Sequence, residues 1–309
     1  MELIRGVHNL YPRHRGCVAT IGNFDGVHLG HQAVLKQTCE KAQEMGLPST
    51  VITFEPQPQE FFRPDQAPPR LTRLREKLLA LGPHAVDRML CLSFNQHLAN
   101  LSAEEFVQTI LIDGLGVRYL VVGDDFRFGK GRQGDFDTLV RAGQQHGFEV
   151  VNTHSFTLDN ERVSSTLIRE ALWQGDLVRV RRLLGRPYSL CGRVAHGDKR
   201  GRTIGFPTAN IYLHRKNTPI LGVYAVQMNG VEDDPVNGVA NIGTRPTVCG
   251  TRTLLEVHLF DFNKDIYGAH IEVMFVKKIR DEKRFESFDA LKQQIHLDAR
   301  QARDILTGS

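Results

Sequence analysis

The order of apolar segments along the first half of the chain constrains the fold most. Short runs rich in apolar residues alternate with longer stretches whose apolar residues recur at helical spacing. These runs are residues 17–22, 49–54, 88–92, 117–123 and 148–153. Strands that are apolar on both faces are typical of a parallel sheet covered by helices on two sides. We therefore expect an α/β domain that binds its ligands beyond the carboxyl ends of the strands.

The pattern changes after a predicted pair of helices at roughly 165–173 and 176–184. Beyond them the chain consists of short runs separated by glycine, proline and asparagine turns. Inward and outward residues alternate within these runs, as they do in an antiparallel barrel. A final helix is predicted at about 286–306. The sequence thus predicts two domains, residues 1–185 and residues 186–309.

Composition excludes several classes of protein. The 309 residues include 41% hydrophobic and 24% charged residues, which is typical of a globular protein, and no apolar run is long enough to span a membrane. The five cysteines are scattered and never form CxxC, which favours a reducing cytoplasm and argues against a structural zinc site. The N-terminus lacks the apolar core of a signal peptide. We expect a cytoplasmic protein without a membrane partner.

The net charge of +4 suits nucleotides as well as it suits nucleic acid. The densest basic stretch, residues 179–186, lies on a predicted helix and its exit. Because no aromatic residues are interleaved there to stack on bases, we interpret it as a solvated helix face. We therefore expect small-molecule partners and no nucleic acid.

The segment 22–31, GNFDGVHLGH, spans the end of the first predicted strand and the start of the first helix. Gly22 and Gly26 allow a tight turn and a close approach of a ligand to the backbone. His28 and His31 can both face the free N–H groups at the helix start, which favour anions. Two such imidazoles could stabilise charge on an α-phosphate as pyrophosphate leaves.

Two other interpretations of these histidines remain open. A histidine near a strand end is often structural, and two histidines within four residues could bind a metal. Metal binding is less favoured, because no glutamate or further histidine recurs at the spacing of an HExxH motif.

A second phosphate-binding candidate is VSSTLIRE, residues 163–170. Ser164, Ser165 and Thr166 lie at a predicted helix start, and Arg169 follows one turn later. The pattern is also that of a capping box. A cap can bind phosphate as well, because hydroxyls, free N–H groups and an arginine then converge.

Together, GxFDGxHxGH and SSTxIR resemble the nucleotidyltransferase superfamily, and in particular the FMN adenylyltransferase module of bacterial FAD synthetases. The resemblance implies a Rossmann-like domain in which His28 and His31 assist adenylyl transfer. The residues that it implies for binding ATP are Gly22, Asn23, Phe24, Gly30, Ser165, Thr166 and Arg169. The segment 123–135 also matches that family, and the resemblance implies that Asp125, Phe126 and Phe128 line the flavin or adenine pocket.

The second half contains GRTIGFPTAN, residues 201–210. Thr208 and Asn210 alternate along an extended segment and so point to one side. Neutral oxygens of this kind suit Mg²⁺, whose other ligands are water and substrate phosphates. The same residues would also be explained, without any function, by a proline–threonine turn in which the asparagine side chain forms a hydrogen bond with its own backbone.

In LLEVHLFDF, residues 254–262, alternation puts Glu256 on the face opposite Leu255 and Val257. A single glutamate on a strand is usually only exposed to solvent. However, four ordered blocks, PTAN, GVANIGTRPT, the Glu256 strand and KKIRDEKRFESFDALKQQIHLD, resemble riboflavin kinase.

The resemblance implies an antiparallel barrel kinase domain in which Glu256 is the base for the ribityl hydroxyl. It assigns Thr208 and Asn210 to Mg-ATP and Gly201 to the nucleotide. Arg280, Glu282 and Phe285 would belong to the flavin-side loop. The implied reactions use ATP and Mg²⁺ to convert riboflavin to FMN, and a second ATP to convert FMN to FAD and pyrophosphate.

Two rival functions are considered. One is another nucleotidyltransferase, such as a cytidylyltransferase, whose second half only binds a ligand. The presence of both PTAN and Glu256, the set that resembles a kinase site, argues against this function. The other is a non-catalytic flavin-binding protein, which would not need His28, His31, Asn210 and Glu256.

Overall fold

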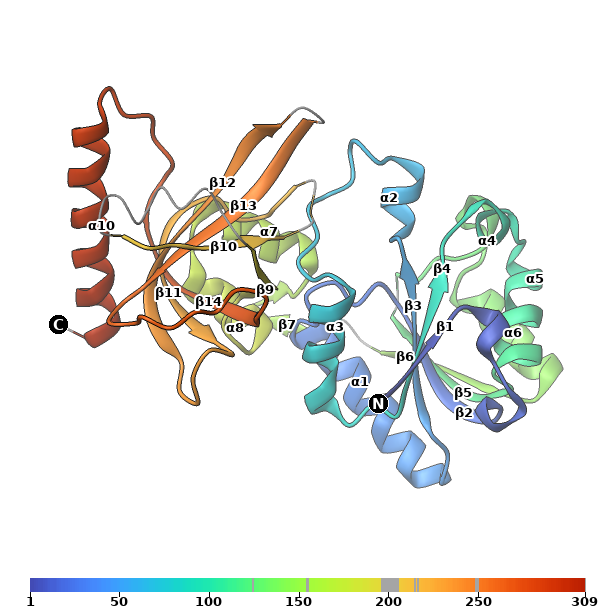
Figure 1. The fold of residues 1–309 in the computed structure, drawn as a ribbon. Coiled ribbons are helices and arrows are strands. Elements are labelled where there is room, and N and C mark those ends of the chain that lie inside the picture. Colours follow the sequence, from blue (N-terminus) through green and yellow to red (C-terminus); the bar gives the residue numbers. More distant parts are fainter. Residues whose placement is uncertain are drawn as a thin grey trace. The chain divides into compact units, whose positions relative to one another are not determined.

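The computed structural model describes residues 1–123, 125–153, 156–195, 206–213, 215, 217–247 and 250–308. The chain divides into two compact units. The first comprises Met1–Pro68 and Lys77–Ser164, and the second comprises Pro69–Glu76 and Ser165–Ser309. Each unit has its own sheet and core (Figure 1).

The first unit contains a parallel six-stranded sheet in the order β1-β4-β3-β2-β5-β6. The strands are β1 (Glu2–Arg5), β2 (Cys17–Ile21), β3 (Ser49–Glu55), β4 (Arg88–Ser93), β5 (Val117–Gly123) and β6 (Glu149–Thr153). The five predicted strands and their parallel arrangement are confirmed, and β1 is an additional edge strand. From β2 the chain continues to β3 on one side and later to β5 on the other, so β2 and β5 flank the topological switch point at which such sheets bind ligands.

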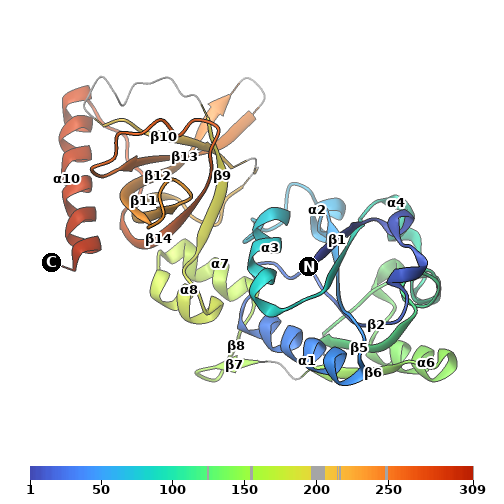
Figure 2. The same cartoon turned by 60° about the horizontal axis from the view of Figure 1, so that its bottom comes forward.

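Helices cover both faces of this sheet (Figure 2). The helices of this part of the chain are α1 (Leu29–Met45), α2 (Pro58–Phe62), α3 (Leu74–Leu81), whose first three residues belong to the second unit, α4 (Gln96–Asn100), α5 (Ala103–Phe106), the π-helix η4 (Val107–Gly114) and α6 (Phe136–His146). Val18 and Val121 pack with Ala42 of α1, while Ala19 and Ile21 pack with residues of α5 and η4. Successive residues of β2 thus bury their side chains on opposite faces, which explains why the strand is apolar throughout.

Short elements complete the first unit. Four 3-10 helices are η1 (Val7–Asn9), η2 (Pro12–His14), η3 (Gly82–His84) and η5 (Lys130–Arg132), and a hairpin is formed by β7 (Thr157–Leu158) and β8 (Glu161–Arg162).

The second unit is a closed antiparallel barrel with strands in the order β10-β13-β12-β11-β14-β9. They are β9 (Ser189–Ala195), β10 (Ala209–Tyr212), β11 (Gly222–Asn229), β12 (Val236–Thr247), β13 (Gly250–Leu259) and β14 (His270–Arg280). The helices are α7 (Ser165–Gln174), α8 (Leu177–Leu184) and α10 (Phe288–Thr307). Ala299 and Ala302 of α10 pack on outward-facing residues of β11 and β12. The predicted barrel and closing helix are confirmed.

The segment Pro69–Glu76 belongs to the second unit although it comes from the first half of the sequence. Glu76 forms an ion pair with Arg215, and the two side chains are only 6% and 3% exposed. Glu76 also accepts a hydrogen bond from the backbone N–H of Cys191 at 2.9 Å. A charged pair this deeply buried is tolerated only when it is well hydrogen-bonded, so these contacts hold the segment against the barrel.

Candidate functional sites

The turn between β2 and α1 has an unusual backbone. Phe24 and Val27 have positive φ angles of 46° and 45°, and Gly26 lies between them at 87°. A left-handed conformation at a β-branched residue such as Val27 costs roughly 1–3 kcal/mol and persists only when its surroundings impose it. Phe24 and Val27 are both buried, so packing imposes the conformation and fixes the start of α1.

His28 and His31 lie together at the start of α1, as predicted. His28 is the N-cap residue, and its Nδ1 accepts a hydrogen bond from the backbone N–H of His31 at 3.3 Å. The two rings are stacked with centroids 3.6 Å apart and an interplanar angle of 15°. A Cβ on Gly30 would lie 3.2 Å from the His28 ring and 3.4 Å from the Val163 carbonyl oxygen. Gly30 is therefore needed for the close packing of this turn.

The electrostatic environment keeps His31 neutral. Burial lowers the pKa of His31 well below its usual value, and the nearby charges of His28 and Lys77 lower it further. Its Nδ1 atom is buried and has no hydrogen-bond partner among the described residues. A buried polar atom of this kind is costly unless a ligand or water satisfies it. The ring can therefore offer a hydrogen bond to a bound group.

Lys77 lies on the core-facing side of α3 and was not singled out from the sequence. Its side chain is 1% exposed, and its Nζ donates to the Asn23 carbonyl oxygen at 2.6 Å and to Thr53 Oγ1 at 3.1 Å. The sequence signal was present, because Lys77 occurs between Leu74 and Leu81 at helical spacing, where an apolar residue is expected.

Ser165 and Thr166 form the first turn of α7, which confirms the predicted helix start. These residues belong to the second unit. Arg169 Nε donates to the Pro69 carbonyl oxygen of the same unit at 2.7 Å. Its guanidinium is thereby oriented by the Pro69–Glu76 segment.

The predicted flavin residues follow β5, the second strand of the switch point. Phe126 and Phe128 are stacked, with ring centroids 5.5 Å apart at 13°, and Phe128 is buried in the core against Phe106. Asp125 forms a largely exposed ion pair with Arg162 at 2.9 Å. Phe128 therefore supports the segment from beneath, while Phe126 and Asp125 are accessible to a ligand.

An aromatic cluster follows β3 and was also missed. The rings of Phe54, Phe61, Phe62 and Phe94 lie 5.4–5.8 Å apart with steep interplanar angles, and Phe62 is 60% exposed. Exposed aromatic faces at the carboxyl end of a parallel strand suit a planar ring system. Nothing in the local sequence distinguishes this cluster from an ordinary core.

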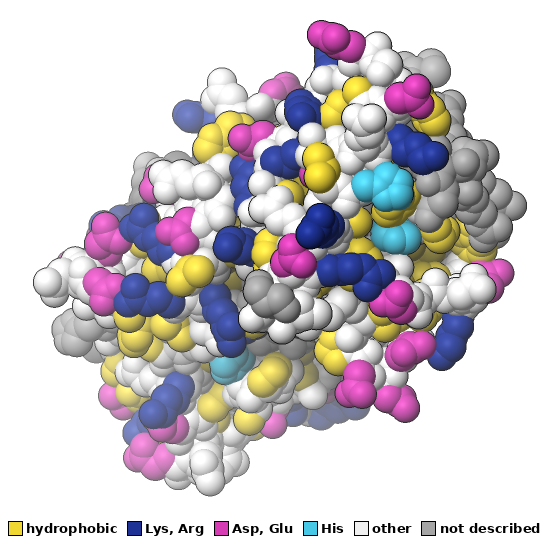
Figure 3. Space-filling view, turned by 90° about the vertical axis from the view of Figure 1, so that its left-hand side faces the viewer, with side chains coloured by type: hydrophobic (Ala, Val, Ile, Leu, Met, Phe, Trp, Pro, Cys, Tyr) yellow, Lys and Arg dark blue, Asp and Glu magenta, His cyan; other side chains and the backbone are white. Residues whose placement is uncertain are grey.

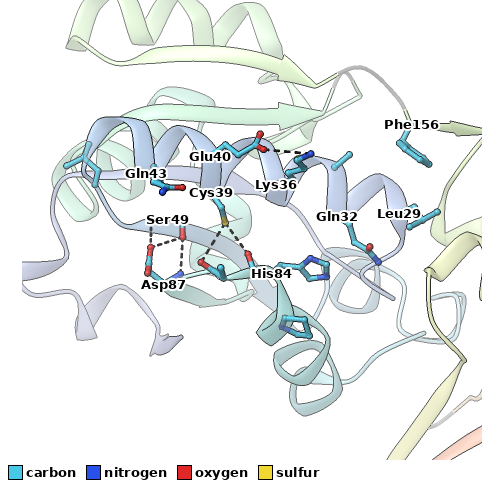
Figure 4. A pocket seen from close by; sticks show the side chains of 15 residues that line it. Leu29, Gln32, Lys36, Cys39, Glu40, Gln43, Ser49, His84, Asp87 and Phe156 are labelled. Atoms are coloured by element: carbon cyan, nitrogen blue, oxygen red, sulfur yellow. Dashed lines mark hydrogen bonds and ion pairs between the residues drawn. The ribbon is translucent and has the colours of Figure 1, made fainter.

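A pocket of about 880 Å³ lies along α1, but none of the predicted site residues lines it. Figure 4 shows Cys39 of α1 pointing toward His84, whereas Lys36 of the same helix points toward Glu40, with which it forms an ion pair. The thiol of Cys39 donates to the His84 carbonyl oxygen at 3.3 Å, and burial raises its pKa. The Asp87 carboxylate accepts bonds from the backbone and hydroxyl of Ser49. These polar groups are bonded within the protein, and the pocket reaches the histidine turn only through its lining residues Leu29 and Gln32.

In the barrel, Glu256 lies between two asparagines on neighbouring strands. The strand register pairs Asn210 of β10 with Glu256 of β13, and Glu256 with Asn241 of β12. Leu255 and Val257 are fully buried, so the alternation that puts Glu256 on the opposite face is confirmed. Side chains directly opposite on adjacent strands have Cβ atoms about 4.5–5.5 Å apart. Asn210, Glu256 and Asn241 therefore form a row, of which Asn241 was missed.

The residues before β10 are fixed next to this row. His258, two positions beyond Glu256 on the same face, has its Nδ1 2.9 Å from the Pro207 carbonyl oxygen, and burial lowers its pKa. The bond identifies Nδ1 as the protonated nitrogen of the neutral ring. Thr208 directly follows Pro207 and is half-buried. Gly201 lies outside the described residues.

The predicted flavin-side residues have distinct surroundings. Arg280 forms a bidentate ion pair with Asp298 of α10 at 2.7–3.1 Å, and its guanidinium lies 5.6 Å from the Phe285 ring centroid. The Glu282 carboxylate lies against Gly243 of β12, at the place that a Cβ would occupy. Desolvation raises the pKa of Glu282, Arg280 opposes this, and the negative charge of Glu256 adds to the rise. Glu282 thus lies within electrostatic range of Glu256.

On the face that Figure 3 shows, basic and acidic side chains are interspersed, so their fields largely cancel. Arg181 and Arg182 are exposed on α8, opposite the buried Val180 and Leu183, whereas Arg186, at the exit of the helix, is half-buried. The interpretation of this stretch as a solvated helix face stays a prediction. Among the described residues, none of the helices has both the length and the apolar character needed to cross a bilayer.

Comparison with known proteins agrees with both halves of this architecture. A family model described as FAD synthetase matches residues 11–167, and one described as riboflavin kinase matches residues 184–306. Proteins named bifunctional riboflavin kinase/FMN adenylyltransferase are similar over nearly their whole length. The one from Escherichia coli is 52% identical (98% of this chain, 97% of the relative), and the one from Pseudomonas fluorescens is 53% identical (100% and 99%).

A crystal structure titled macrolide-efflux protein, from Streptococcus pneumoniae, has a TM-score of 0.81 and 30% identity, covering 98% of this chain and 99% of that one. The architecture is thus that of a two-part flavin-related transferase, in which a Rossmann-like nucleotidyltransferase part is joined to a barrel kinase part. The chain belongs to the family of bifunctional riboflavin kinase/FMN adenylyltransferases.

Proposed function

We propose that this chain converts riboflavin to FMN in its barrel unit and FMN to FAD at the histidine turn of its parallel-sheet unit. ATP is the second substrate of both reactions. One observation supports this division most strongly. The stacked histidines and the Glu256 row belong to two separate units, and each set of residues suits one of the two reactions.

In the adenylyltransferase reaction, the FMN phosphate attacks the α-phosphate of ATP and pyrophosphate leaves. No covalent nucleophile is needed, so positioning and electrostatic stabilisation supply the catalysis. His31 has a buried Nδ1 without a partner among the described residues, and the first N–H groups of α1 favour an anion. We assign His28 and His31 to the α-phosphate, with Gly22, Asn23, Phe24 and Gly30 forming the nucleotide-binding turn.

Ser165, Thr166 and Arg169 are assigned to the β- and γ-phosphates. The Val163 backbone lies beside Gly30 in the first unit, and Ser165 follows two residues later in the chain. Hydroxyls at a helix start and a guanidinium suit phosphate oxygens. Asp125 and Phe126, which follow β5 at the switch point, are assigned to the flavin, and Phe128 is assigned to the same pocket as the buried ring on which Phe126 stacks.

In the kinase reaction, Glu256 accepts the proton of the terminal ribityl hydroxyl as its oxygen attacks the γ-phosphate. A carboxylate is a competent general base when it lies within hydrogen-bond reach of that hydroxyl. Arg280, Glu282 and Phe285 are assigned to the flavin side of the site, and Gly201 to the nucleotide.

Thr208 and Asn210 are proposed as the protein ligands of Mg²⁺ or of its bound water. The fit rests on the donor set, because Asn210 is directly opposite Glu256 and offers a neutral oxygen. Mg²⁺ takes few protein ligands and several phosphate oxygens. When bound, it neutralises charge on the transferring phosphate.

Further assignments follow from the sequence. We propose residues 1–185 and 186–309 as the two domains, whereas the compact units divide between Ser164 and Ser165 and place α7 and α8 with the barrel. The family matches leave 168–183 unassigned, so the boundary stays a prediction. We also propose a cytoplasmic location, with small-molecule partners and neither nucleic acid nor a membrane. The four cysteines among the described residues are free thiols, consistent with a reducing compartment.

The direct test is chromatography of riboflavin, FMN and FAD after incubation with Mg-ATP. The wild-type chain should form FMN and then FAD from riboflavin. Glu256→Gln should block FMN formation by roughly 100- to 10,000-fold and still convert added FMN to FAD. Glu286→Gln, an exposed glutamate of the same unit, is the control. If wild-type enzyme makes neither product, the proposed function is wrong.

A further inference from the structure

Lys77 is a buried cation directly beneath the histidine turn. Its side chain is 1% exposed, and its Nζ donates to the Asn23 carbonyl oxygen at 2.6 Å and to Thr53 Oγ1 at 3.1 Å. Removing an ammonium group from water costs several kcal/mol unless other groups compensate it. An apolar residue at this position of α3 would avoid the cost, so the charge itself needs an explanation.

A continuous set of contacts leads from Lys77 to the histidines. Asn23, whose carbonyl Lys77 holds, directly precedes Phe24, which is buried and has a positive φ of 46°. The Phe24 ring packs against the His31 ring, with centroids 5.1 Å apart, and His31 stacks on His28. The peptide that Lys77 anchors therefore sets the position of the ring on which the histidine pair rests.

Lys77 also acts on His31 through its charge. The titratable groups whose charges act on His31 are His28 of α1 and Lys77 of α3, while Asp25 is the buried carboxyl of the same turn. Burial is the largest cause of the lowered pKa of His31, and the positive charges add to it. A neutral His31 has one ring N–H to donate and remains stacked without like-charge repulsion from its neighbour.

We propose that Lys77 is a positioning residue for adenylyl transfer: its buried ammonium holds the Asn23 carbonyl, and thereby the turn that presents His28 and His31 to the α-phosphate. The inference rests on the proposed role of the two histidines. It goes beyond that role, because it makes a residue on another helix necessary for their geometry.

The test compares Lys77→Met, which removes the charge and the donor, with Lys77→Arg, which keeps both. Lys36→Met is the matched control, because Lys36 is on α1 with a side chain that is 75% exposed. Adenylylation of FMN is measured as kcat and KM. Riboflavin phosphorylation in the same preparation reports on the folded barrel unit, and far-UV circular dichroism reports on the folding of the whole chain, including the parallel-sheet unit. Each rate is followed across pH.

Lys77→Met should lower kcat for adenylylation by roughly 10- to 100-fold, because small misplacements of catalytic groups are costly. KM for FMN should change little, and riboflavin phosphorylation should stay within about twofold of wild type, since Lys77 only positions the histidine turn. Loss of the positive charge favours protonated His31, so the acidic limb of the pH profile should move to higher pH. Lys77→Arg should return that limb toward the wild-type position.

Three results would overturn the inference. The first is Lys77→Met behaving like Lys36→Met in adenylylation. The second is an equal loss of both activities, and the third is an unshifted acidic limb; either of these would indicate a purely structural lysine. If Lys77→Met is insoluble, Lys77→Gln replaces it with the same expected shift. Failure of the histidine role is recognised separately, because His28→Ala and His31→Ala would then leave FAD formation intact.

Discussion

The two units build their sites in different ways. In the parallel-sheet unit, the proposed catalytic residues lie at the start of α1, directly after a turn whose backbone is held in left-handed conformations at Phe24 and Val27. In the barrel, they lie on strands, and the register sets Glu256 between Asn210 and Asn241. The geometry of the first site depends on side-chain contacts such as that of Lys77 with Asn23. The geometry of the second site depends on the alternation of side chains along each strand and on the pairing of neighbouring strands. Substitutions should therefore separate the two activities.

After Glu256→Gln, the largest effect on activity is expected at the histidine pair. His28→Ala combined with His31→Ala removes the proposed donors to the α-phosphate, so FAD formation from FMN should fall by roughly 100- to 1,000-fold. Riboflavin should still become FMN. The measurement is chromatography of the flavins, and His146→Ala, an exposed histidine on α6, is the control. Equal loss of both activities would contradict the separation of the two sites.

The next prediction concerns the stability of the barrel unit and the contribution of the buried ion pair between Glu76 and Arg215. Arg215→Met leaves the buried Glu76 carboxylate without its charged partner and should lower the unfolding free energy by about 3–5 kcal/mol. Urea unfolding can be followed by circular dichroism in the far ultraviolet, because Trp173, the single tryptophan, is already 72% exposed in the folded protein. Arg303→Met, which breaks the exposed pair with Asp261, should change the midpoint little. Equal shifts for the two variants would show that the Glu76 contact is unimportant.

A smaller effect is expected at Asn241, which the strand register places opposite Glu256 in the proposed kinase site. Asn241→Ala removes a polar neighbour of Glu256 and should lower riboflavin phosphorylation by about tenfold, with adenylylation unchanged. Asn237→Ala, on the same strand, is the control, because Asn237 instead bonds Gln227. Activity equal to wild type would exclude Asn241 from the site.

Much of this architecture could be predicted from the sequence, because it follows from local patterns. Doubly buried strands such as 117–123 predict a parallel sheet, and the alternation around Glu256 fixes its face. The pairing of Asn241 with Glu256 could not be predicted, because it depends on the register between strands. Alternation along one strand leaves that register open.

Lys77 shows a different limit of prediction from the sequence. Its position on the apolar side of a helix signals that something is unusual, but its partners Asn23 and Thr53 are 54 and 24 residues away in sequence. Similarly, the buried pair of Glu76 and Arg215 joins the two halves of the sequence within one unit. Sequence periodicity is local, so it shows on which side of a helix a residue lies but not which distant residue it contacts.

Complementation tests most directly whether the two sites work independently. Glu256→Gln alone should make neither FMN nor FAD from riboflavin, and the His28→Ala, His31→Ala double variant should stop at FMN. A mixture of the two proteins with riboflavin and Mg-ATP should produce FAD, because the FMN made by one can be adenylylated by the other. If each variant retains its own partial activity and the mixture still makes no FAD, the two sites do not act as separate centres.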